Sequence, residues 1–401
     1  MPDRRIASLP VFGLNSWAGT FKSTTPCTLD QANVFYTTSG RAAILLALEV
    51  FGIGPGDSVL LPTYHCPTMV APTALRGATP MFYPIDAVGT PNLAWLETQD
   101  LRHVRVMLAA HYFGAPQPMG SIREWCGSRG IALIEDCAHA MFGLSGKRPI
   151  GAWGNIAICS LTKFFPVPEG GCLIFNSEQS LPRRLNPSTF RNHVKAAVDI
   201  LEVGALNNQL PGLNGLVTGF LRGLRSLRKG RNGNGAALPC RAGNQMGVTA
   251  SDFDIDPAIA HRAIADPCRW VAASLPRSRI VDRRRRNFEF LQRELTGLTA
   301  LHPLLAGLPD NCAPYVFPLW LDTPDPGYAE LRRLGVPVFR WDRLWPSVPN
   351  IPGDMGRLWS HHVLQLACHQ DLTPSDLEHV VCTVKHLYGA APPSQPSIAL
   401  A

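Results

Sequence analysis

Short apolar segments alternate with segments of helical period across residues 36–175 of this 401-residue chain. Apolar runs such as Ser58–Pro62 and Val104–Ala110 have the length of buried strands, and the stretches between them are long enough for helices. Parallel strands must be joined by a crossover of about a dozen residues or more, usually a helix. The alternation therefore predicts parallel pairing with helical crossovers, and so an α/β fold on a mainly parallel sheet.

The length predicts more than one domain. A long helix predicted over 277–297 begins a second part of the chain. We expect a large domain over 1–275, with an insertion at about 185–250 that is rich in Gly, Asn and basic residues. A smaller C-terminal α/β domain over 276–390 and a disordered tail at 391–401 follow.

Net charge and cysteine content indicate which ligands and which cellular compartment suit this chain. The net charge of +7 suits an anionic ligand or a membrane surface, but no nucleic-acid-binding motif accompanies it. The eleven cysteines contain no C-x-x-C pair, which is typical of reduced thiols in the cytoplasm. We find no signal segment and no apolar run of about 20 residues. We expect a cytoplasmic protein, at most peripheral at the inner membrane surface, that binds no nucleic acid.

The segment Ile134-Glu-Asp-Cys-Ala-His139 follows a predicted strand. Ligands of open α/β sheets bind at the carboxyl ends of the strands. A buried carboxylate there can keep the pyridine nitrogen of pyridoxal phosphate (PLP) protonated, which the cofactor needs in order to act as an electron sink. Asp136 is the candidate for this role. The alternative is a simple N-cap of the next helix.

The segment Ser160-Leu-Thr-Lys163 follows another predicted strand and precedes aromatic residues and prolines. Desolvation in such surroundings lowers the pKa of a lysine and leaves a nucleophilic amine, as a Schiff base with PLP requires. Ser160 is a candidate for holding the cofactor phosphate. The alternative is a surface lysine on a hairpin.

The segment Thr38-Ser-Gly-Arg-Ala-Ala43 opens an apolar helix. Backbone N–H groups at a helix N-terminus bind phosphate, and Arg41 can add a charge-assisted contact. Gly40, Arg41 and Ala42 are therefore predicted to bind the cofactor, with a plain Ser N-cap as the alternative. Together, the three motifs predict a PLP enzyme.

The chain also resembles the DegT/StrS-type sugar aminotransferases, a branch of the fold-type-I PLP enzymes. The matching segments are Gly52–Asp57, Gly77–Pro80, His111–Pro116, Ile134–Ala140 and Glu169–Gly171, with a looser match at Leu364–His369. The resemblance implies a fold-type-I PLP-transferase large domain (aspartate aminotransferase-like) and a homodimer with shared active sites. It also implies that glutamate is the default amino donor and that a keto compound is the acceptor.

Carried over to the matching positions, the resemblance assigns three catalytic residues. Lys163 would form the Schiff base and move a proton, Asp136 would pair with the pyridine nitrogen, and His139 would contact the cofactor near its phenolic oxygen. Ser160 and the turn at 40–42 would bind the phosphate.

Two positions depart from the resembled family. Where the family places an aromatic ring that stacks on the cofactor, this chain has Cys66, with Tyr64 or His65 as alternatives for stacking. The family's Gly-Tyr-Asn-Tyr-Arg segment is absent, and residues 251–257 stand in its neighbourhood. The predicted function is amino transfer from an amino acid, by default glutamate, to a keto acceptor, with a keto sugar as one option. The alternatives are another PLP-dependent reaction (decarboxylation, elimination or condensation) or a non-catalytic PLP-fold scaffold.

Residues 213–229 place apolar side chains on one helical face, opposite Arg222, Arg225 and Lys229. Such a segment packs on its own protein or across a dimer, lies at an anionic membrane surface, or docks to a partner protein.

Three further sets of residues have side chains that could contact solvent, substrate or a metal ion. The run Arg283–Arg286 is interpreted as a solvated helix face. Arg340 and Trp341 are candidates for substrate contact. The His and Cys residues over 361–369 do not repeat a metal-ligand spacing, so no metal is predicted.

Overall fold

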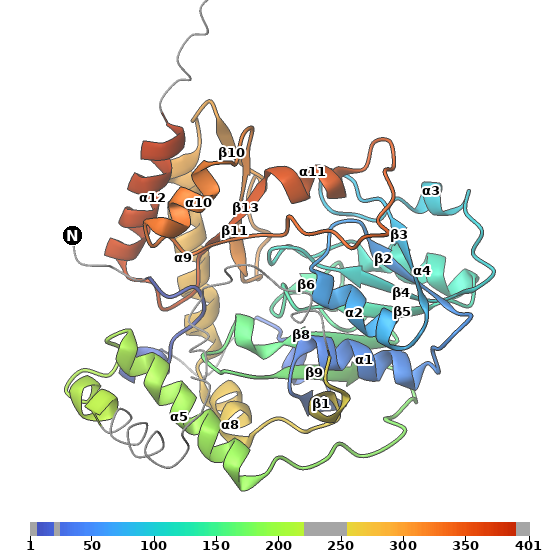
Figure 1. Ribbon diagram of the computed structural model, residues 1–401, viewed down its shortest axis with the longest axis horizontal. Coiled ribbons are helices and arrows are strands. Elements are labelled where there is room, and N and C mark those ends of the chain that lie inside the picture. Colours follow the sequence, from blue (N-terminus) through green and yellow to red (C-terminus); the bar gives the residue numbers. More distant parts are fainter. Residues whose placement is uncertain (1–5, 20–24, 220–254, 390–401) are drawn as a thin grey trace, which may run out of the picture.

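The computed structural model describes residues 6–19, 25–219 and 255–389, which contain two main sheets (Figure 1). The larger sheet has seven strands in the order β1-β9-β8-β5-β4-β2-β3. Its strands are β1 (Val34–Thr37), β2 (Ser58–Pro62), β3 (Thr79–Tyr83), β4 (Val104–Ala110), β5 (Ala132–Asp136), β8 (Ile156–Ser160) and β9 (Gly171–Phe175). The pairs β2–β3, β2–β4, β4–β5 and β5–β8 are parallel. The predicted α/β fold with a mainly parallel sheet is therefore confirmed.

Two strands depart from the parallel pairing expected over 36–175. β9 is antiparallel to β8, and β1 is antiparallel to β9. Only residues 161–170 connect β8 to β9, which is shorter than the crossover that a parallel pair needs. The short connection therefore turns the chain back beside β8, with the candidate lysine at the bend.

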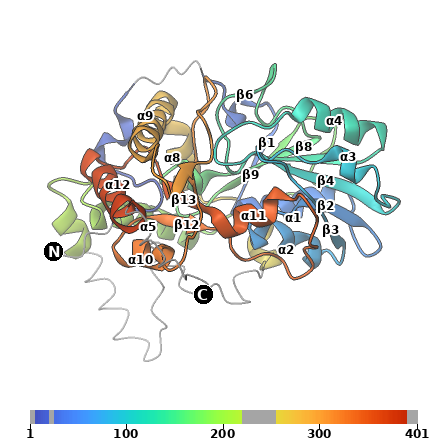
Figure 2. The same cartoon turned by 90° about the horizontal axis from the view of Figure 1, so that it is seen from above.

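Helices lie on both faces of the large sheet (Figure 2). On one face α1 (Gly40–Val50) packs against α2 (Pro67–Leu75) and contacts β8 and β9. On the other face α4 (Met119–Ser128) contacts β5. The short helix α3 (Leu93–Leu96) and the hairpin of β6 (Leu144–Ser145) and β7 (Arg148–Pro149) lie in the connections. The sheet is thus covered on both faces, as parallel sheets require.

The C-terminal part of the chain forms a second, four-stranded antiparallel sheet in the order β10-β11-β13-β12. Its strands are β10 (Leu301–Pro303), β11 (Val316–Leu321), β12 (Val338–Arg340) and β13 (Val363–Ala367). The helices of this part are α9 (Arg277–Leu295), α10 (Gly327–Arg333), α11 (Met355–His362) and α12 (Pro374–Tyr388). Apolar side chains of α9, α12 and the strands share one buried cluster.

Along the sequence, between the last strand of the large sheet and the first strand of the second sheet, the chain also forms α5 (Phe190–Leu206), α7 (Pro257–Ala260) and α8 (Asp266–Ser274), and residues 214–219 are helical. Residues 220–254, which include most of the predicted amphipathic segment and much of the predicted insertion, lie outside the described residues, as does the predicted tail at 391–401. Within the described ranges, no helix is long and apolar enough to cross a membrane.

Candidate functional site

Asp136 and Lys163 lie at the carboxyl ends of two adjacent parallel strands. Asp136 is the last residue of β5 and pairs in register with Ile158 of β8. Two residues later β8 ends at Ser160, and the short 3-10 turn η3 (Leu161–Lys163) presents the lysine at the same edge. Asp136 is buried and Lys163 is half-buried. The two motifs predicted from sequence therefore meet at one place.

The two groups influence each other's ionisation. Burial lowers the pKa of Lys163 below its usual range, while the negative charge of Asp136 opposes this shift. Burial raises the pKa of Asp136, while Lys163 and the backbone N–H of Ala138, which donates to its carboxylate at 2.8 Å, oppose that shift. The result is an amine that loses its proton more readily than an exposed lysine, next to a carboxyl group from which water is largely excluded.

His139 offers hydrogen-bonding atoms that nothing in the described part of the chain uses. It is buried, and neither of its ring nitrogens has a partner among the described residues. Its ring lies 4.5 Å from that of Tyr315 and 4.8 Å from that of Trp341, between centroids. Burial lowers its pKa well below the usual range, so the imidazole is neutral. Buried polar atoms without partners are rare in native proteins and here indicate a ligand.

The N-terminus of α1 lies beside Ser160. Ser39 caps this 11-residue helix by accepting a hydrogen bond from the backbone N–H of Ala42. A Cβ placed on Gly40 would lie 3.5 Å from the Cβ of Ser160, and the hydroxyl oxygens of Ser160 and Thr162 are 3.3 Å apart. Two hydroxyls and the N-terminus of a helix therefore adjoin one another, as a phosphate site requires. The predicted residues Gly40, Arg41 and Ala42 are the first three residues of α1.

β9, the strand that follows the lysine turn, packs closely against the N-terminus of α1. A Cβ on Gly171 would collide with the carbonyl group of Ser39 and the backbone nitrogen of Gly40. The missing side chain at Gly171 therefore allows β9 to pass directly against the turn that begins α1.

The position predicted for the stacking ring is occupied by the half-buried Cys66, which is close enough to Lys163 to affect the pKa of its amine. The two alternatives for the stacking ring, Tyr64 and His65, are both buried, and both form hydrogen bonds with other residues of the chain. The Tyr64 hydroxyl accepts from Gln365 at 3.0 Å. The ring of His65 donates from Nδ1 to the carbonyl of Pro62 at 2.9 Å and accepts at Nε2 from a backbone N–H at 3.1 Å.

Aromatic rings reach the lysine from the second sheet. The ring of Tyr315, just before β11, has its centroid 5.1 Å from Nζ of Lys163. Trp341 follows β12 and packs on both His139 and Tyr64. Trp341 was a candidate for substrate contact from the sequence. Tyr315 was missed, because nothing in its local sequence distinguishes it from any residue that begins a strand.

Arg284 of α9 is the second residue that sequence reasoning missed. Its side chain is fully buried, so the interpretation of Arg283–Arg286 as a solvated face is wrong at this position. Arg284 shares its face of the helix with the buried residues Ile280, Phe288 and Leu291. This spacing of four, four and three residues is the helical period, and it could have identified Arg284 as buried.

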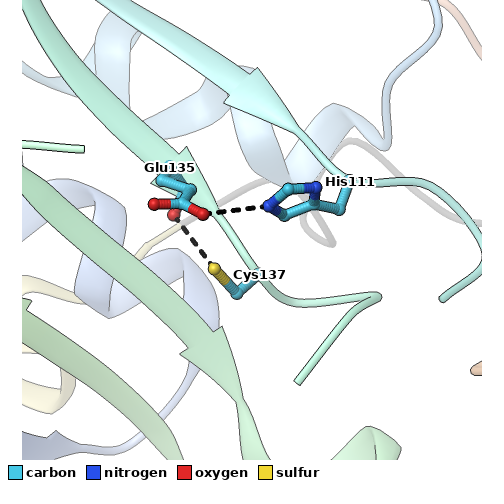
Figure 3. Close-up of side chains that lie close together, drawn as sticks. All are labelled: His111, Glu135 and Cys137. Carbon is cyan, nitrogen blue, oxygen red and sulfur yellow. Dashed lines mark hydrogen bonds and ion pairs between the residues drawn. The ribbon is translucent and has the colours of Figure 1, made fainter. Parts of the chain in front are cut away.

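Glu135, adjacent to Asp136, belongs to a separate cluster with His111 and Cys137 (Figure 3). Nε2 of His111 donates to its carboxylate at 3.0 Å, and three backbone N–H groups donate to it at 2.7 to 3.0 Å, from Gly151, Trp153 and Gly154. Burial raises the pKa of Glu135, but these hydrogen bonds together hold it below its usual value.

The hydrogen bonds of this cluster leave no room for a metal ion. Nδ1 of His111 accepts from the backbone N–H of Gln117 at 2.8 Å, so Nε2 carries the ring proton. Neither ring nitrogen then has a free lone pair. The Glu135 cluster therefore acts as a structural anchor for the loop at 151–154.

Comparison with known proteins shows which family the region of the large sheet is similar to. Residues 25–200 match the DegT/DnrJ/EryC1/StrS aminotransferase family. The UDP-N-acetyl-3-dehydro-alpha-D-glucosamine 3-aminotransferase of Acidithiobacillus ferrooxidans is 30% identical over 162 residues, which cover 39% of this chain and 42% of that protein. The GDP-perosamine synthase of Escherichia coli O157:H7 is 30% identical over 168 residues, which cover 39% of this chain and 45% of that protein. The chain therefore matches less than half the length of these curated relatives.

Solved structures share the fold over most of the chain. The aminotransferase TlmJ of Streptoalloteichus hindustanus superposes with a TM-score of 0.58 at 21% identity, covering 88% of this chain and 85% of that chain. DesV of S. venezuelae, solved in complex with a ketimine intermediate, gives a TM-score of 0.58 at 20% identity, covering 90% and 86%. Through its residues 25–200, this chain is thus similar to the DegT/DnrJ/EryC1/StrS aminotransferase family.

Proposed function

We propose that this protein is a PLP-dependent aminotransferase with Lys163 as the residue that binds the cofactor covalently. The observation that carries the proposal is the meeting of Lys163 and Asp136 at adjacent strand ends, each with its pKa shifted by burial. The family match and the names of the relatives favour transamination over other PLP-dependent reactions and over a scaffold without turnover.

The residues of the site fit PLP. Asp136 matches a protonated pyridine nitrogen, and the unused ring nitrogens of His139 match the cofactor's polar edge. Ser160, Thr162 and the N-terminal end of α1 (residues 40–42) match a phosphate group. Cys66 faces this space in place of an aromatic ring.

PLP, when bound, supplies an aldehyde that condenses with amines and a ring that withdraws electrons from the reacting carbon. Asp136 would hold a proton on the ring nitrogen, because its carboxylate is buried and lacks other strong donors. Nζ of Lys163 would move a proton between the substrate carbon and the cofactor, and a lowered pKa favours the neutral amine that this role requires. His139 would orient the cofactor by a hydrogen bond, and Tyr315 and Trp341 would exclude water above the amine.

We propose an amino acid, by default glutamate, as the amino donor and a keto sugar as the acceptor. The support for a keto sugar is that the relatives are named for amino transfer to nucleotide-linked sugars or for synthesis of an amino sugar. A homodimer with shared active sites and a cytoplasmic location complete the proposal. The described cysteines are free thiols, which suits a reducing compartment.

We propose, as a separate property, peripheral contact with an anionic membrane through the segment that begins at Leu213. In the described part of this segment, the side chains of Leu213 and Leu216 are 46% and 71% exposed. Exposed leucines near basic residues suit the interface of an anionic bilayer. Val217, in contrast, packs against a buried apolar cluster that includes residues of β8, β9, α5 and α8.

The function is tested by fixing PLP to the protein with borohydride. We expect mass spectrometry of peptides to find the adduct on Lys163, and we expect Lys163→Ala to lose both the adduct and turnover while keeping its fold. Addition of glutamate to the wild-type protein should change the visible absorbance of the bound cofactor, and a keto sugar should reverse the change. An adduct on a different lysine would overturn the assignment, and a spectrum indifferent to every amino acid would overturn transamination.

A further inference from the structure

Arg284 is a buried cation in the middle of α9 (Figure 1). Its side chain is fully buried, whereas Arg286 on the same helix is exposed. Within the described parts of the chain, its guanidinium donates hydrogen bonds only to neutral oxygens. Burial lowers its pKa to about 10, so it stays charged at neutral pH. Burying a charge without an anionic partner costs free energy, which only well-placed hydrogen bonds offset.

These hydrogen bonds join three segments that are far apart in the sequence. Nη2 donates to the carbonyl of Lys163 at 2.7 Å. Nη1 donates to the carbonyls of Pro314 and Tyr315 at 2.9 and 3.1 Å. Nε donates to the side-chain oxygen of Gln370 at 2.7 Å. One planar group thereby fixes the backbone of the lysine turn relative to Tyr315 and the start of β11.

The neighbouring residue, Phe164, is held from the same side. The guanidinium carbon of Arg284 lies 4.6 Å from the centroid of its ring. The side-chain nitrogen of Gln370 donates to its carbonyl at 2.9 Å. The turn that carries the amine is therefore restrained at two consecutive carbonyls, both by side chains from the C-terminal part of the chain.

We propose that Arg284 is a positioning residue for Lys163. By holding the carbonyls of Lys163 and Tyr315, it keeps Nζ against the Tyr315 ring and away from water. Arg284 touches no reacting atom and acts through the lysine. The inference rests on the proposed function in that it takes Lys163 as the reactive amine.

The test compares Arg284→Lys, Arg284→Gln and the control Arg286→Gln on the same helix. The full-length protein, freed of carbonyl cofactors with hydroxylamine, is treated with trinitrobenzenesulfonate, which reacts with neutral amines. Peptide mass spectrometry follows the rate at Lys163 against pH, with the exposed Lys195 in the same sample as reference. Arg284→Lys keeps the positive charge but cannot reproduce the planar set of hydrogen bonds.

In the wild-type protein and Arg286→Gln, we expect Lys163 to react with a pH midpoint below that of Lys195. In both Arg284 variants the midpoint should move up by about one pH unit, toward that of Lys195, because the released turn admits water to the amine. Circular dichroism checks that the fold is retained. Folded Arg284 variants with an unchanged midpoint would overturn the proposal, and so would loss of fold in both, since Arg284 would then be a general structural residue.

The same data distinguish this inference from the proposed function. If the wild-type midpoints of Lys163 and Lys195 coincide, the premise of a reactive Lys163 fails, and the inference fails with it. If Lys163 is reactive in the wild-type protein and in the Arg284 variants alike, only the positioning role fails.

Discussion

Burial makes ionisation of both Lys163 and Asp136 unfavourable, so each lowers the stability of the folded chain when it is charged. The two effects change in opposite directions with pH. The pKa of Lys163 is lowered from the ordinary value of 10.5, so protonating it in the folded chain costs stability as the pH falls. The pKa of Asp136 is raised from 3.8, so ionising it costs stability as the pH rises. Binding of a ligand that pairs with Asp136 would relieve the cost of ionising this carboxyl group.

The first residue-scale prediction tests this cost with the double variant Lys163→Met with Asp136→Asn. Without cofactor at pH 7, we expect its free energy of unfolding to exceed that of the wild-type protein by about 1–3 kcal/mol. The difference should shrink as the pH rises toward 10.5, because Lys163 then loses its proton in the folded state and no longer bears the cost of a buried charge. Urea unfolding at several pH values measures it. A difference that grows with pH over this interval would contradict the assigned pKa shift.

The second residue-scale prediction concerns Asp136 in the loaded enzyme. Asp136→Asn removes the anion that would hold a proton on the ring nitrogen of the cofactor. We expect kcat to fall by about two orders of magnitude or more, equivalent to roughly 3 kcal/mol, while borohydride still attaches the cofactor to Lys163. Steady-state kinetics with glutamate measure the loss. Near-normal kcat in this variant would show that a different acid has the role.

Among the elements, the large sheet was readily predicted and the contacts between sheets were not. β2 and β4 begin and end where the sequence indicates, because Gly, Pro and polar residues bound runs of apolar residues. The direction of β9 was missed, since it depends on the length of a short connection. Asp136 and Lys163 could be brought together because parallel strands present their carboxyl ends at one edge. Tyr315 and Arg284 come from segments more than a hundred residues later, which only tertiary packing brings to the lysine.

At the scale of elements, β9 depends on the absence of a side chain at Gly171. We expect Gly171→Ala to displace β9 from the start of α1 and to lower both the melting temperature and the affinity for PLP, because the added Cβ collides with backbone atoms. Gly127→Ala is the matched control. It lies in α4 with open space around it and should be neutral or stabilising by up to about 1 kcal/mol. Equal effects of the two substitutions would contradict this role of Gly171.

A separate prediction concerns the loop at 151–154, which the hydrogen bonds of Glu135 hold in place. Glu135→Gln keeps the shape of the side chain but leaves backbone N–H groups of the loop at 151–154 without a charged acceptor. We expect a loss of stability of about 2–4 kcal/mol, measured by urea unfolding. Removal of metal ions with a chelator should change nothing, because His111 has no free lone pair. Chelator-sensitive stability of the wild-type protein would argue for an ion in the cluster.

At the scale of the whole molecule, the region of α5 and α8 presents apolar side chains to solvent. Phe190 is 82% exposed and Trp270 is 58% exposed, and both line a cavity of about 650 Å³. Exposed apolar patches of this kind mark sites of interaction. The exposed Leu213 and Leu216 lie on the segment that follows α5.

The last prediction concerns this segment and lipid. We expect the wild-type protein to co-sediment with anionic vesicles at low salt and to be released as salt is added. Leu216→Asp should reduce binding, because it replaces an exposed apolar side chain with an acidic one. Leu75→Asp, at an exposed leucine of α2 (47%, against 71% for Leu216), should not. Protein that stays in solution with anionic vesicles at low salt would exclude the membrane contact.

The contacts of Arg284 have a consequence for the order in which the protein is made. A ribosome synthesises Lys163 and all seven strands of the large sheet before it reaches Arg284, Tyr315 or Gln370. The nascent chain can therefore form the sheet while the lysine turn lacks its support. The lysine acquires its final environment only once the chain has been translated beyond Gln370. A chain that stops before Arg284 would therefore lack the hydrogen bonds that restrain the turn of Lys163.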